Sequence, residues 1–283
     1  SAQNLLQSRH GERIAVRPLM GELSSEAQDL ALRPDAEGRR KIILATNIAQ
    51  TSLTVEGVTT VVDGGLVRVA RFDLGDGSDR LETQRVSRAS AEQRAGRAGR
   101  LGPGACYRLW SREQHGVLAA HDTPEILAVD LTRFALELAA WGASDPVALA
   151  LLDAPPAVNW AYARERLAEF NALDDSGRIN AHGRELARLP TAPRRAHMLL
   201  AAKARGIGDI AAWVAATLDE RDPAGGSDLA ERVRRYRRGG GEPNASRRVR
   251  ESAQQLLRLI DAKENRNDDE ALIADAVAWA YPE

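Results

Sequence analysis

Three arginines and two glycines recur within SAEQRAGRAGR, residues 90–100, in a pattern that could bind an anion. Arg94, Arg97 and Arg100 occupy every third position, and Gly96 and Gly99 lie between them. Guanidinium groups bind phosphates and carboxylates through paired N–H donors. The stretch is therefore a candidate anion-binding element.

The same stretch carries a local energetic cost if it is helical. Ser90 followed by Gln93 is a capping-box pattern, which predicts that a helix begins at Ser90. Glycines inside the helix, like charges three residues apart and cations in the first turns would together cost roughly 2–3 kcal/mol. A bound anion would offset this cost, as at functional sites that break local rules. The alternative is a solvated arginine face with two packing glycines, and this stretch alone leaves both open.

Length and composition set wider limits. A chain of 283 residues with 43% hydrophobic residues can form two or three ordinary domains. Its net charge of −1 gives no global sign of nucleic-acid binding, so such a role would need local patches. Cys106 is the one cysteine, which excludes an internal disulfide and a cysteine-rich zinc site. No signal peptide or long apolar run is present, so we expect a soluble, cytoplasmic protein without a membrane partner.

The first 110 residues have the pattern of an α/β domain. Short apolar runs read as buried strands, and one helical segment that ends at Pro34 lies between the first two. Such strands alternating with helices predict a parallel sheet. The predicted strands are 13–19, 41–46, 59–65 and 105–110, the helix is 24–34, and 71–86 reads as a hairpin with its turn at GDGSD.

From about residue 123 the pattern becomes helical. Residues 173–186 place a turn, a short strand and a helix start together, which fits a winged-helix-like module, with a plain helical bundle as the alternative. Three apolar stripes recur at helical spacing: Leu127, Leu131, Phe134, Leu138 and Trp141; Trp160, Ala163, Leu167 and Phe170; and Ile207, Ile210, Val214 and Leu218.

Polar residues follow the strand at 41–46. Thr46 and Asn47 fall at its carboxyl end, where α/β sheets bind ligands, and Thr51 adds a hydroxyl just beyond. These groups could donate hydrogen bonds to phosphates, although ordinary helix capping is the alternative. Together with the arginine stretch, they make two candidate anion-binding elements on one predicted sheet.

This pair of segments resembles two signature motifs of the DEAH-box group of superfamily 2 helicases. ATNIAQTSL (45–53) is similar to motif V, QRAGRAGR (93–100) is similar to motif VI, and PLMGELS (18–24) is similar to the segment before motif V. The resemblance implies a second RecA-like, or helicase C-terminal, domain over residues 1–122. A winged-helix-like domain at 123–192 and a ratchet-like helical bundle at 193–283 would follow.

The resemblance also implies roles at the nucleotide. Arg97 and Arg100 would be arginine fingers that stabilise charge on the transferred γ-phosphoryl group of ATP. Gln93 would orient the attacking water or contact the γ-phosphate, and Arg94 would pair within the protein. ATP with Mg²⁺ is the implied cofactor, with the metal ligands outside this chain.

Further nucleotide contacts follow from the same resemblance. Glu56 would lie near the ribose or the metal. Leu32 stands where some relatives carry an aromatic residue that stacks on the base, so it would offer only apolar contact. The chain departs from the family at Gln50, where glutamate is usual, which removes a charge but keeps hydrogen bonding.

The implied partner is single-stranded nucleic acid, with RNA favoured over DNA. Thr46, Asn47 and Thr51 would hold its backbone. The basic run at 231–251 would add phosphate contacts through Arg232 and Arg235, unless it is only a solvated face.

Two motifs that a helicase needs do not occur in this sequence. It contains no G-x-x-x-x-G-K-[ST] phosphate-binding loop and no Asp-Glu-x-His box. We therefore expect a piece of a larger enzyme that lacks the first RecA-like domain, is inactive alone and takes that domain as a partner. The alternative is a non-catalytic nucleic-acid-binding module.

Overall fold

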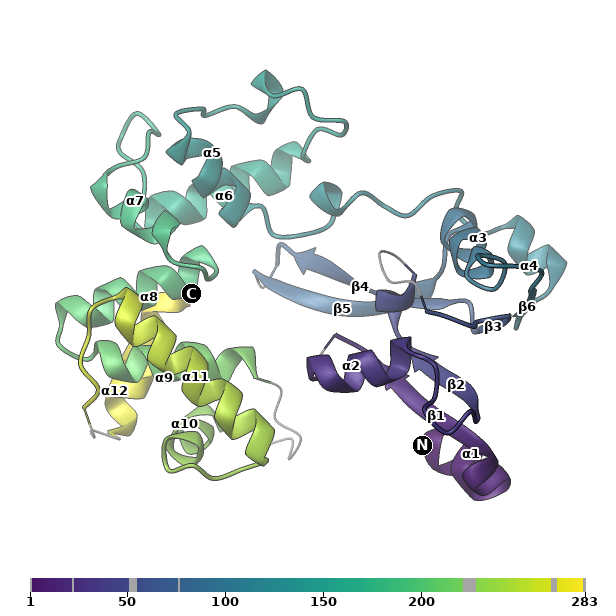
Figure 1. The fold of residues 1–283 in the computed structure, drawn as a ribbon. Coiled ribbons are helices and arrows are strands. Elements are labelled where there is room, and N and C mark those ends of the chain that lie inside the picture. The colour runs from purple at the N-terminus through teal and green to yellow at the C-terminus, as the bar shows by residue number, and fades with distance from the viewer. Residues whose placement is uncertain are drawn as a thin grey trace. The chain divides into compact units, whose positions relative to one another are not determined.

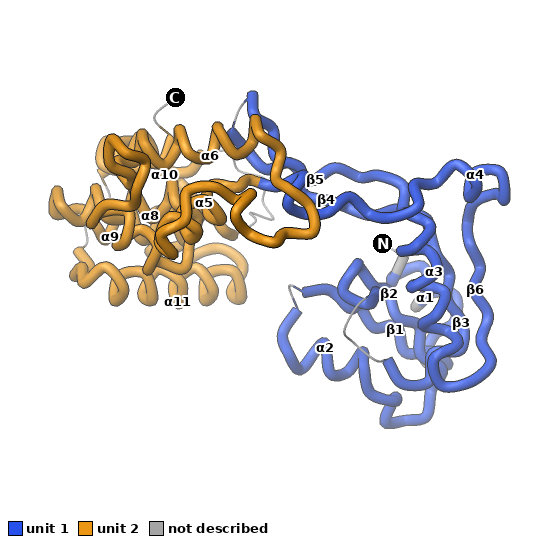
Figure 2. Tube along the Cα trace, turned by 90° about the horizontal axis from the view of Figure 1, so that it is seen from above, with its two compact units in different colours: residues 1–129 blue, residues 130–283 orange. Residues whose placement is uncertain are grey.

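The chain forms two compact units, Ser1–Val129 and Asp130–Glu283, shown in blue and orange in Figure 2. The computed structural model describes residues 2–21, 23–50, 55–75, 77–220, 228–265 and 269–281. The first unit is α/β and the second is helical, as the sequence predicts (Figure 1). Their boundary lies a few residues after the predicted one, and the Phe72 N–H donates to the Ala128 carbonyl at 2.7 Å, which ties residues up to 128 to the first unit.

The strands of the first unit pair in twos. β1 (Ile14–Leu19) runs parallel to β2 (Arg40–Ala45), and β3 (Thr60–Asp63) runs parallel to β6 (Ala105–Arg108). β4 (Leu66–Asp73) and β5 (Ser78–Arg85) form the antiparallel hairpin, which begins five residues before the predicted start. The remaining elements are α1 (Ala2–His10), η1 (Gly11–Arg13), α2 (Ser25–Leu32), η2 (Asn47–Ala49), α3 (Arg88–Gly96), α4 (Arg112–Gly116) and η3 (Glu125–Leu127).

The predicted parallel pairing is confirmed, but among the described residues it is divided between two separate two-stranded sheets and not joined in one sheet. Within the part of the chain that the structure describes, no strand pairs with the second edge of β2 or of β3. Side chains of the apolar run Ile42–Ile43–Leu44 are in consequence only partly buried. Such continuous apolar runs are typical of central strands of parallel sheets.

Polar contacts satisfy backbone groups at both ends of α2. The Ser24 hydroxyl accepts from the Ala27 N–H and caps the start of the helix. At the other end, Lys41 Nζ donates to the carbonyls of Ala31 at 2.7 Å and Arg33 at 2.6 Å. Burial lowers the pKa of Lys41. Both ends of the helix therefore have polar partners supplied by neighbouring residues.

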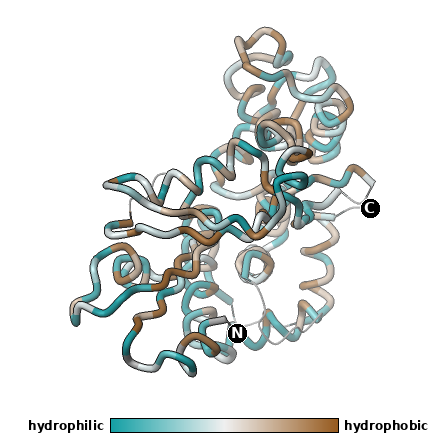
Figure 3. Tube along the Cα trace, turned by 90° about the vertical axis from the view of Figure 1, so that its right-hand side faces the viewer, coloured by the Kyte–Doolittle hydropathy of each residue, from teal (hydrophilic) through white to brown (hydrophobic). Residues whose placement is uncertain are grey.

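The second unit is built around α9 (Gly208–Asp219), whose residues 208–217 are all buried. Ile207 and Leu218 of the predicted stripe are only half-buried, whereas between them burial extends around the whole helix and not along one face only. Figure 3 shows hydrophilic and hydrophobic residues alternating along the helices. The other elements are α5 (Thr132–Ala140), η4 (Pro146–Ala148), α6 (Ala157–Glu169), α7 (Ala181–Arg188), α8 (Pro193–Ala204), α10 (Leu229–Arg237), α11 (Pro243–Leu259) and α12 (Glu270–Ala280).

The segment at 173–186 has the predicted turn and helix start. Leu173 and Ile179 form an antiparallel bridge, and Asn180 caps α7 by accepting from the Gly183 N–H at 2.9 Å. The first apolar stripe is wrong at Trp141, the C-cap residue of α5, which is 84% exposed although its backbone is still helical. Residues 130–283 form one compact unit, and its division into a winged-helix-like and a ratchet-like domain stays a prediction.

Candidate functional site

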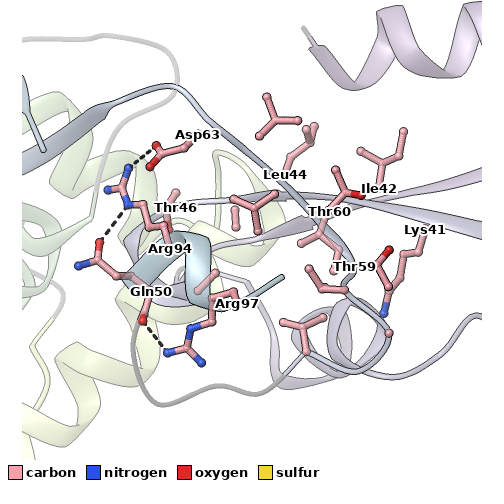
Figure 4. A pocket seen from close by; sticks show the side chains of 18 of the residues that line it. Lys41, Ile42, Leu44, Thr46, Gln50, Thr59, Thr60, Asp63, Arg94 and Arg97 are labelled. Atoms are coloured by element: carbon pink, nitrogen blue, oxygen red, sulfur yellow. Dashed lines mark hydrogen bonds and ion pairs between the residues drawn. The ribbon is translucent and has the colours of Figure 1, made fainter. Parts of the chain in front are cut away.

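A cavity of about 1880 Å³ lies in the first unit between β2 and β3 (Figure 4). Thr46 and Asp63 lie at one end of it, and Lys41 and Thr59 lie at the other, so the two strands run in the same direction. The cavity is larger than the roughly 300–1000 Å³ of small-molecule sites. Its lining includes Arg94, Arg97 and Arg100. The two candidate anion-binding elements therefore meet at the carboxyl ends of these strands.

The helix that carries the arginines begins earlier than predicted. α3 begins at Arg88, and the Ser87 hydroxyl accepts from the Ser90 N–H at 3.0 Å. Ser90 is thus the third residue of the helix, and the predicted cap at Ser90 is wrong. Two serines three residues apart allow either start, and the hydrogen bond from Ser90 N–H selects the first.

This earlier start reverses the estimated cost of the arginines. Arg94 lies in the last turn of α3, Arg97 is the C-cap residue, and Arg100 lies beyond the helix. Cations near a helix C-terminus are stabilised by the helix dipole. Gly96 is the final helical residue and Gly99 lies outside, so the predicted penalty for glycines in a helix interior is also largely absent.

Arg94 pairs within the protein, as predicted. Its Nη1 contacts Asp63 Oδ1 at 2.9 Å, and the two side chains are only 16% and 2% exposed. The same guanidinium donates to the Leu66 carbonyl at 3.2 Å and to Asn47 Oδ1 at 3.4 Å. Arg94 therefore joins the residues after β2 to the last residue of β3.

Gln50 connects the segment after β2 to α3. Its Nε2 donates to Ser90 Oγ at 2.6 Å and to Gln93 Oε1 at 3.3 Å, and its Oε1 accepts from Arg94 Nε at 3.1 Å. Its backbone carbonyl accepts from Arg97 Nη2 at 2.5 Å. Gln50 thus contacts three residues of α3 and the C-cap residue Arg97.

The three predicted catalytic residues differ in setting. Arg97 is half-buried and Arg100 is exposed, and both line the cavity. Gln93 is exposed and does not line the cavity, but it is joined to the lining through Gln50. Arg100 makes no hydrogen bond or ion pair with any other described residue. The site thus holds one arginine in place and leaves another open to solvent.

The remaining predicted ligand-binding residues are only partly brought together. Thr46, Asn47 and Glu56 are exposed and line the cavity. Leu32, the last residue of α2, is half-buried and does not line it. Thr51 lies outside the described residues.

The basic run of the second unit is engaged in contacts within the protein. Arg232 Nη2 donates to the carbonyls of Thr217 at 3.1 Å and Glu220 at 2.6 Å, at the end of α9. The Arg235 guanidinium lies 5.5 Å from the ring centroid of Tyr236, which is 1% exposed. These contacts favour a structural role for the run, and nucleic-acid binding by Arg232 and Arg235 stays a prediction.

Two polar residues of the site do not follow from the sequence patterns. Ser90 Oγ donates to Asp122 Oδ2 at 2.5 Å, and Ser90 is 4% exposed. Asp122 is 32 residues from Ser90 along the chain and belongs to no motif, so no local pattern could have revealed it. The pattern around Ser90 indicates only a helix cap.

The described residues contain no group of three or more histidine, cysteine, aspartate or glutamate side chains that could hold a metal ion. The guanidinium groups at the cavity fit the phosphates of a nucleotide, since their donors match phosphate oxygens. This chain would therefore contribute positively charged arginine side chains to the phosphates of a nucleotide–metal complex. Within the same residues, no helix has the length and apolar character needed to cross a membrane.

Comparisons with known proteins agree with these features. Residues 1–102 match the family model of the helicase conserved C-terminal domain. The chain is 43% identical over 99% of its length to ATP-dependent RNA helicase HrpB of Escherichia coli (strain K12), and it covers 33% of that protein. It is 38% identical over 66% of its length to the pre-mRNA-splicing factor ATP-dependent RNA helicase prp22 of Schizosaccharomyces pombe, covering 16% of that protein.

Solved structures give the same result. The crystal structure of Escherichia coli DEAH/RHA helicase HrpB matches 99% of this chain with a TM-score of 0.86, and 34% of that structure is covered. A second structure, of the Escherichia coli DExH-box NTPase HrpB, matches with a TM-score of 0.78. The chain thus spans about a third of the length of the Escherichia coli HrpB protein that it matches.

Proposed function

Because the chain belongs to the DEAH/RHA helicase family, we propose that it supplies catalytic arginines and part of the single-strand channel of an ATP-dependent RNA helicase. The observation that carries this proposal is the end of the cavity that is formed by the carboxyl ends of β2 and β3. There, arginines of motif VI and the Thr46–Asn47 pair of motif V line one space. Phosphate groups are the common ligand that both sets of side chains would recognise.

Arg97 and Arg100 would act on the phosphates of ATP held against a second RecA-like domain. Arg97 is anchored on the Gln50 carbonyl, so its guanidinium is already oriented before nucleotide binds. Preorganised charge of this kind stabilises negative charge that develops in the transition state. Gln93 would orient the water that attacks the γ-phosphate. When bound, ATP with Mg²⁺ would supply the phosphoryl group and the positive charge of the metal.

Thr46 and Asn47 would contact the backbone of single-stranded RNA with neutral donors. Asn47 also accepts from Arg94, which in turn binds Asp63 and Gln50. A shift of the segment after β2 would therefore reach α3 through direct hydrogen bonds. We propose that this connection links the RNA contact to the ATP site.

Binding of labelled single-stranded RNA, followed by fluorescence anisotropy across a salt series, tests the RNA contact. Thr46→Ala should lower affinity and leave the dependence on salt nearly unchanged, because a neutral donor releases no counterion. Ser8→Ala, at an exposed position of α1, is the matched control and should change neither. Unchanged RNA affinity in Thr46→Ala would remove motif V from the proposed channel.

Phosphate release separates an enzyme part from a binding module. The 283-residue chain should release no phosphate from ATP, with or without RNA, because it has no phosphate-binding loop. A longer protein that contains it should release phosphate. If the longer protein binds RNA but never hydrolyses ATP, the chain is part of a non-catalytic nucleic-acid-binding module instead.

A further inference from the structure

The side chain of Gln50 sits at the centre of a chain of hydrogen bonds with a fixed direction. At one end, Arg94 can only donate, and its Nε donates to Gln50 Oε1 at 3.1 Å. At the other end, the Asp122 carboxylate can only accept, and it receives the Ser90 hydroxyl proton. Gln50 and Ser90 lie between these two fixed ends.

The donor and acceptor inventory leaves one arrangement for the middle of this chain. A serine hydroxyl has a single proton, so Ser90 must accept from its other neighbour once it donates to Asp122. Gln50 must therefore turn its NH₂ toward Ser90, at 2.6 Å, and its oxygen toward Arg94. The amide orientation is thus determined by its partners.

A carboxylate at position 50 could not complete this chain. Glutamate would still accept from Arg94, but it has no proton to give to Ser90 Oγ or to Gln93 Oε1. It would also place a second negative charge next to the Ser90–Asp122 pair. The glutamine at position 50 is therefore matched, through Ser90, to the aspartate at position 122.

We propose that Gln50 is a positioning residue. Its neutral amide, paired with Asp122 through Ser90, fixes the position of α3 and of Arg97 relative to motif V. The proposal rests on the proposed function for its catalytic consequence only. The side-chain amide anchors residue 50 to α3, and the backbone carbonyl of the same residue accepts from Arg97 at 2.5 Å. Displacing the amide would therefore move the acceptor that orients Arg97.

A cycle of two single variants and their double variant, made in the 283-residue protein, tests the donor and acceptor directions of these hydrogen bonds. Gln50→Glu should speed amide hydrogen exchange at residues 90–94 of α3 about tenfold, the effect of one buried unsatisfied group. Asp122→Asn alone should have a small effect, since the asparagine oxygen still accepts from Ser90. In the double variant, the introduced asparagine can donate to Ser90, which frees the serine proton for the introduced glutamate. Exchange should then return close to the wild-type rate.

The same variants in a longer, ATP-hydrolysing protein test positioning. Gln50→Glu should lower kcat about tenfold with KM for ATP nearly unchanged, as one lost hydrogen-bonded contact implies, and Asp122→Asn should restore kcat in the double variant. Gln84→Glu, the same chemical change at an exposed position of β5, is the control and should alter neither constant. A role limited to packing would not reproduce this rescue.

The outcomes are distinct. Additive effects of Gln50→Glu and Asp122→Asn on amide hydrogen exchange would overturn the proposed directions of the hydrogen bonds between Arg94, Gln50, Ser90 and Asp122. Rescue of exchange with kcat unaffected by Gln50→Glu would overturn the positioning role. Absence of ATP hydrolysis in every protein, wild type included, would count against the proposed function, and the exchange result would still decide the chain of hydrogen bonds.

Discussion

The two units of this molecule are stabilised in different ways. In the second unit, α9 is enclosed by its neighbours, and fully buried large side chains such as Trp213, Met198 and Leu199 form its core. Among the largest fully buried side chains of the described residues, only Leu19 and Val86 belong to the first unit. Helices satisfy their backbone groups internally, whereas strands depend on neighbours. The first unit therefore relies more on the polar contacts around α3.

Hydrogen exchange should reveal the largest difference between the units. We expect backbone amides of β2 and β3 to exchange on the order of a thousandfold faster than those of α9, because local opening free energies span from near zero to the full unfolding free energy of several kcal/mol. Mass spectrometry of peptic fragments measures this ratio. Equal protection of β2, β3 and α9 would contradict the comparison.

Removal of Arg94 should test the polar support of the first unit. Arg94→Ala leaves the carboxylate of Asp63, 2% exposed, without its ion-pair partner. Breaking such a pair costs about 3–5 kcal/mol of unfolding free energy. Arg88→Ala, on the same helix at an exposed position, should change stability by less than about 0.5 kcal/mol. Similar urea midpoints for the two variants would show that the ion pair does not support this unit.

A leucine-to-alanine substitution in each unit compares how much stability buried apolar side chains contribute there. Leu199→Ala, at a position with no exposed surface, should cost about 2–5 kcal/mol of unfolding free energy. Leu44→Ala, at a half-buried position of β2, should cost clearly less, because less apolar surface is lost. Chemical unfolding followed by a probe in each unit measures both. A larger cost at Leu44 would mean that β2 is buried in solution.

Acid should affect the second unit through His197. Burial, reinforced by the nearby His182, lowers the pKa of His197 from 6.5 to about 4. Between pH 6.5 and about 4, the unfolded chain therefore binds a proton at His197 that the folded chain does not. The contribution of neutral His197 to the free energy of unfolding is complete above pH 6.5 and is lost as the pH falls toward 4. His197→Gln should reduce the loss of stability across that window. An unchanged pH dependence would mean that His197 titrates normally.

The smallest expected effect concerns the basic run. Arg232→Ala should lower the stability of the second unit by about 1–2 kcal/mol, because two carbonyls at the end of α9 lose a charged donor. If the contacts in the structure are its main role, the salt dependence of RNA binding should stay nearly the same. A flatter salt dependence would instead support the sequence-based prediction that Arg232 contacts phosphate.

How far the sequence alone predicts this molecule depends on the range of each interaction. The strands, the hairpin and the positions of motifs V and VI follow from local patterns, whereas the start of α3 does not, because Ser87 and Ser90 are both acceptable caps. Two separate parallel pairs and the partnership of Gln50 with Asp122 depend on contacts between distant residues. Periodicity and spacing carry no information about these contacts.

Steady-state ATP hydrolysis by a longer protein that contains this chain tests most directly whether the arginines of motif VI act on ATP, as we propose. Arg97→Ala should lower kcat by roughly 10³-fold or more, as for arginine fingers in GTPases, with much less change in ATP affinity. Arg88→Ala should retain full activity. A kcat that survives Arg97→Ala, with only ATP affinity reduced, would contradict the claim and assign Arg97 to ground-state binding.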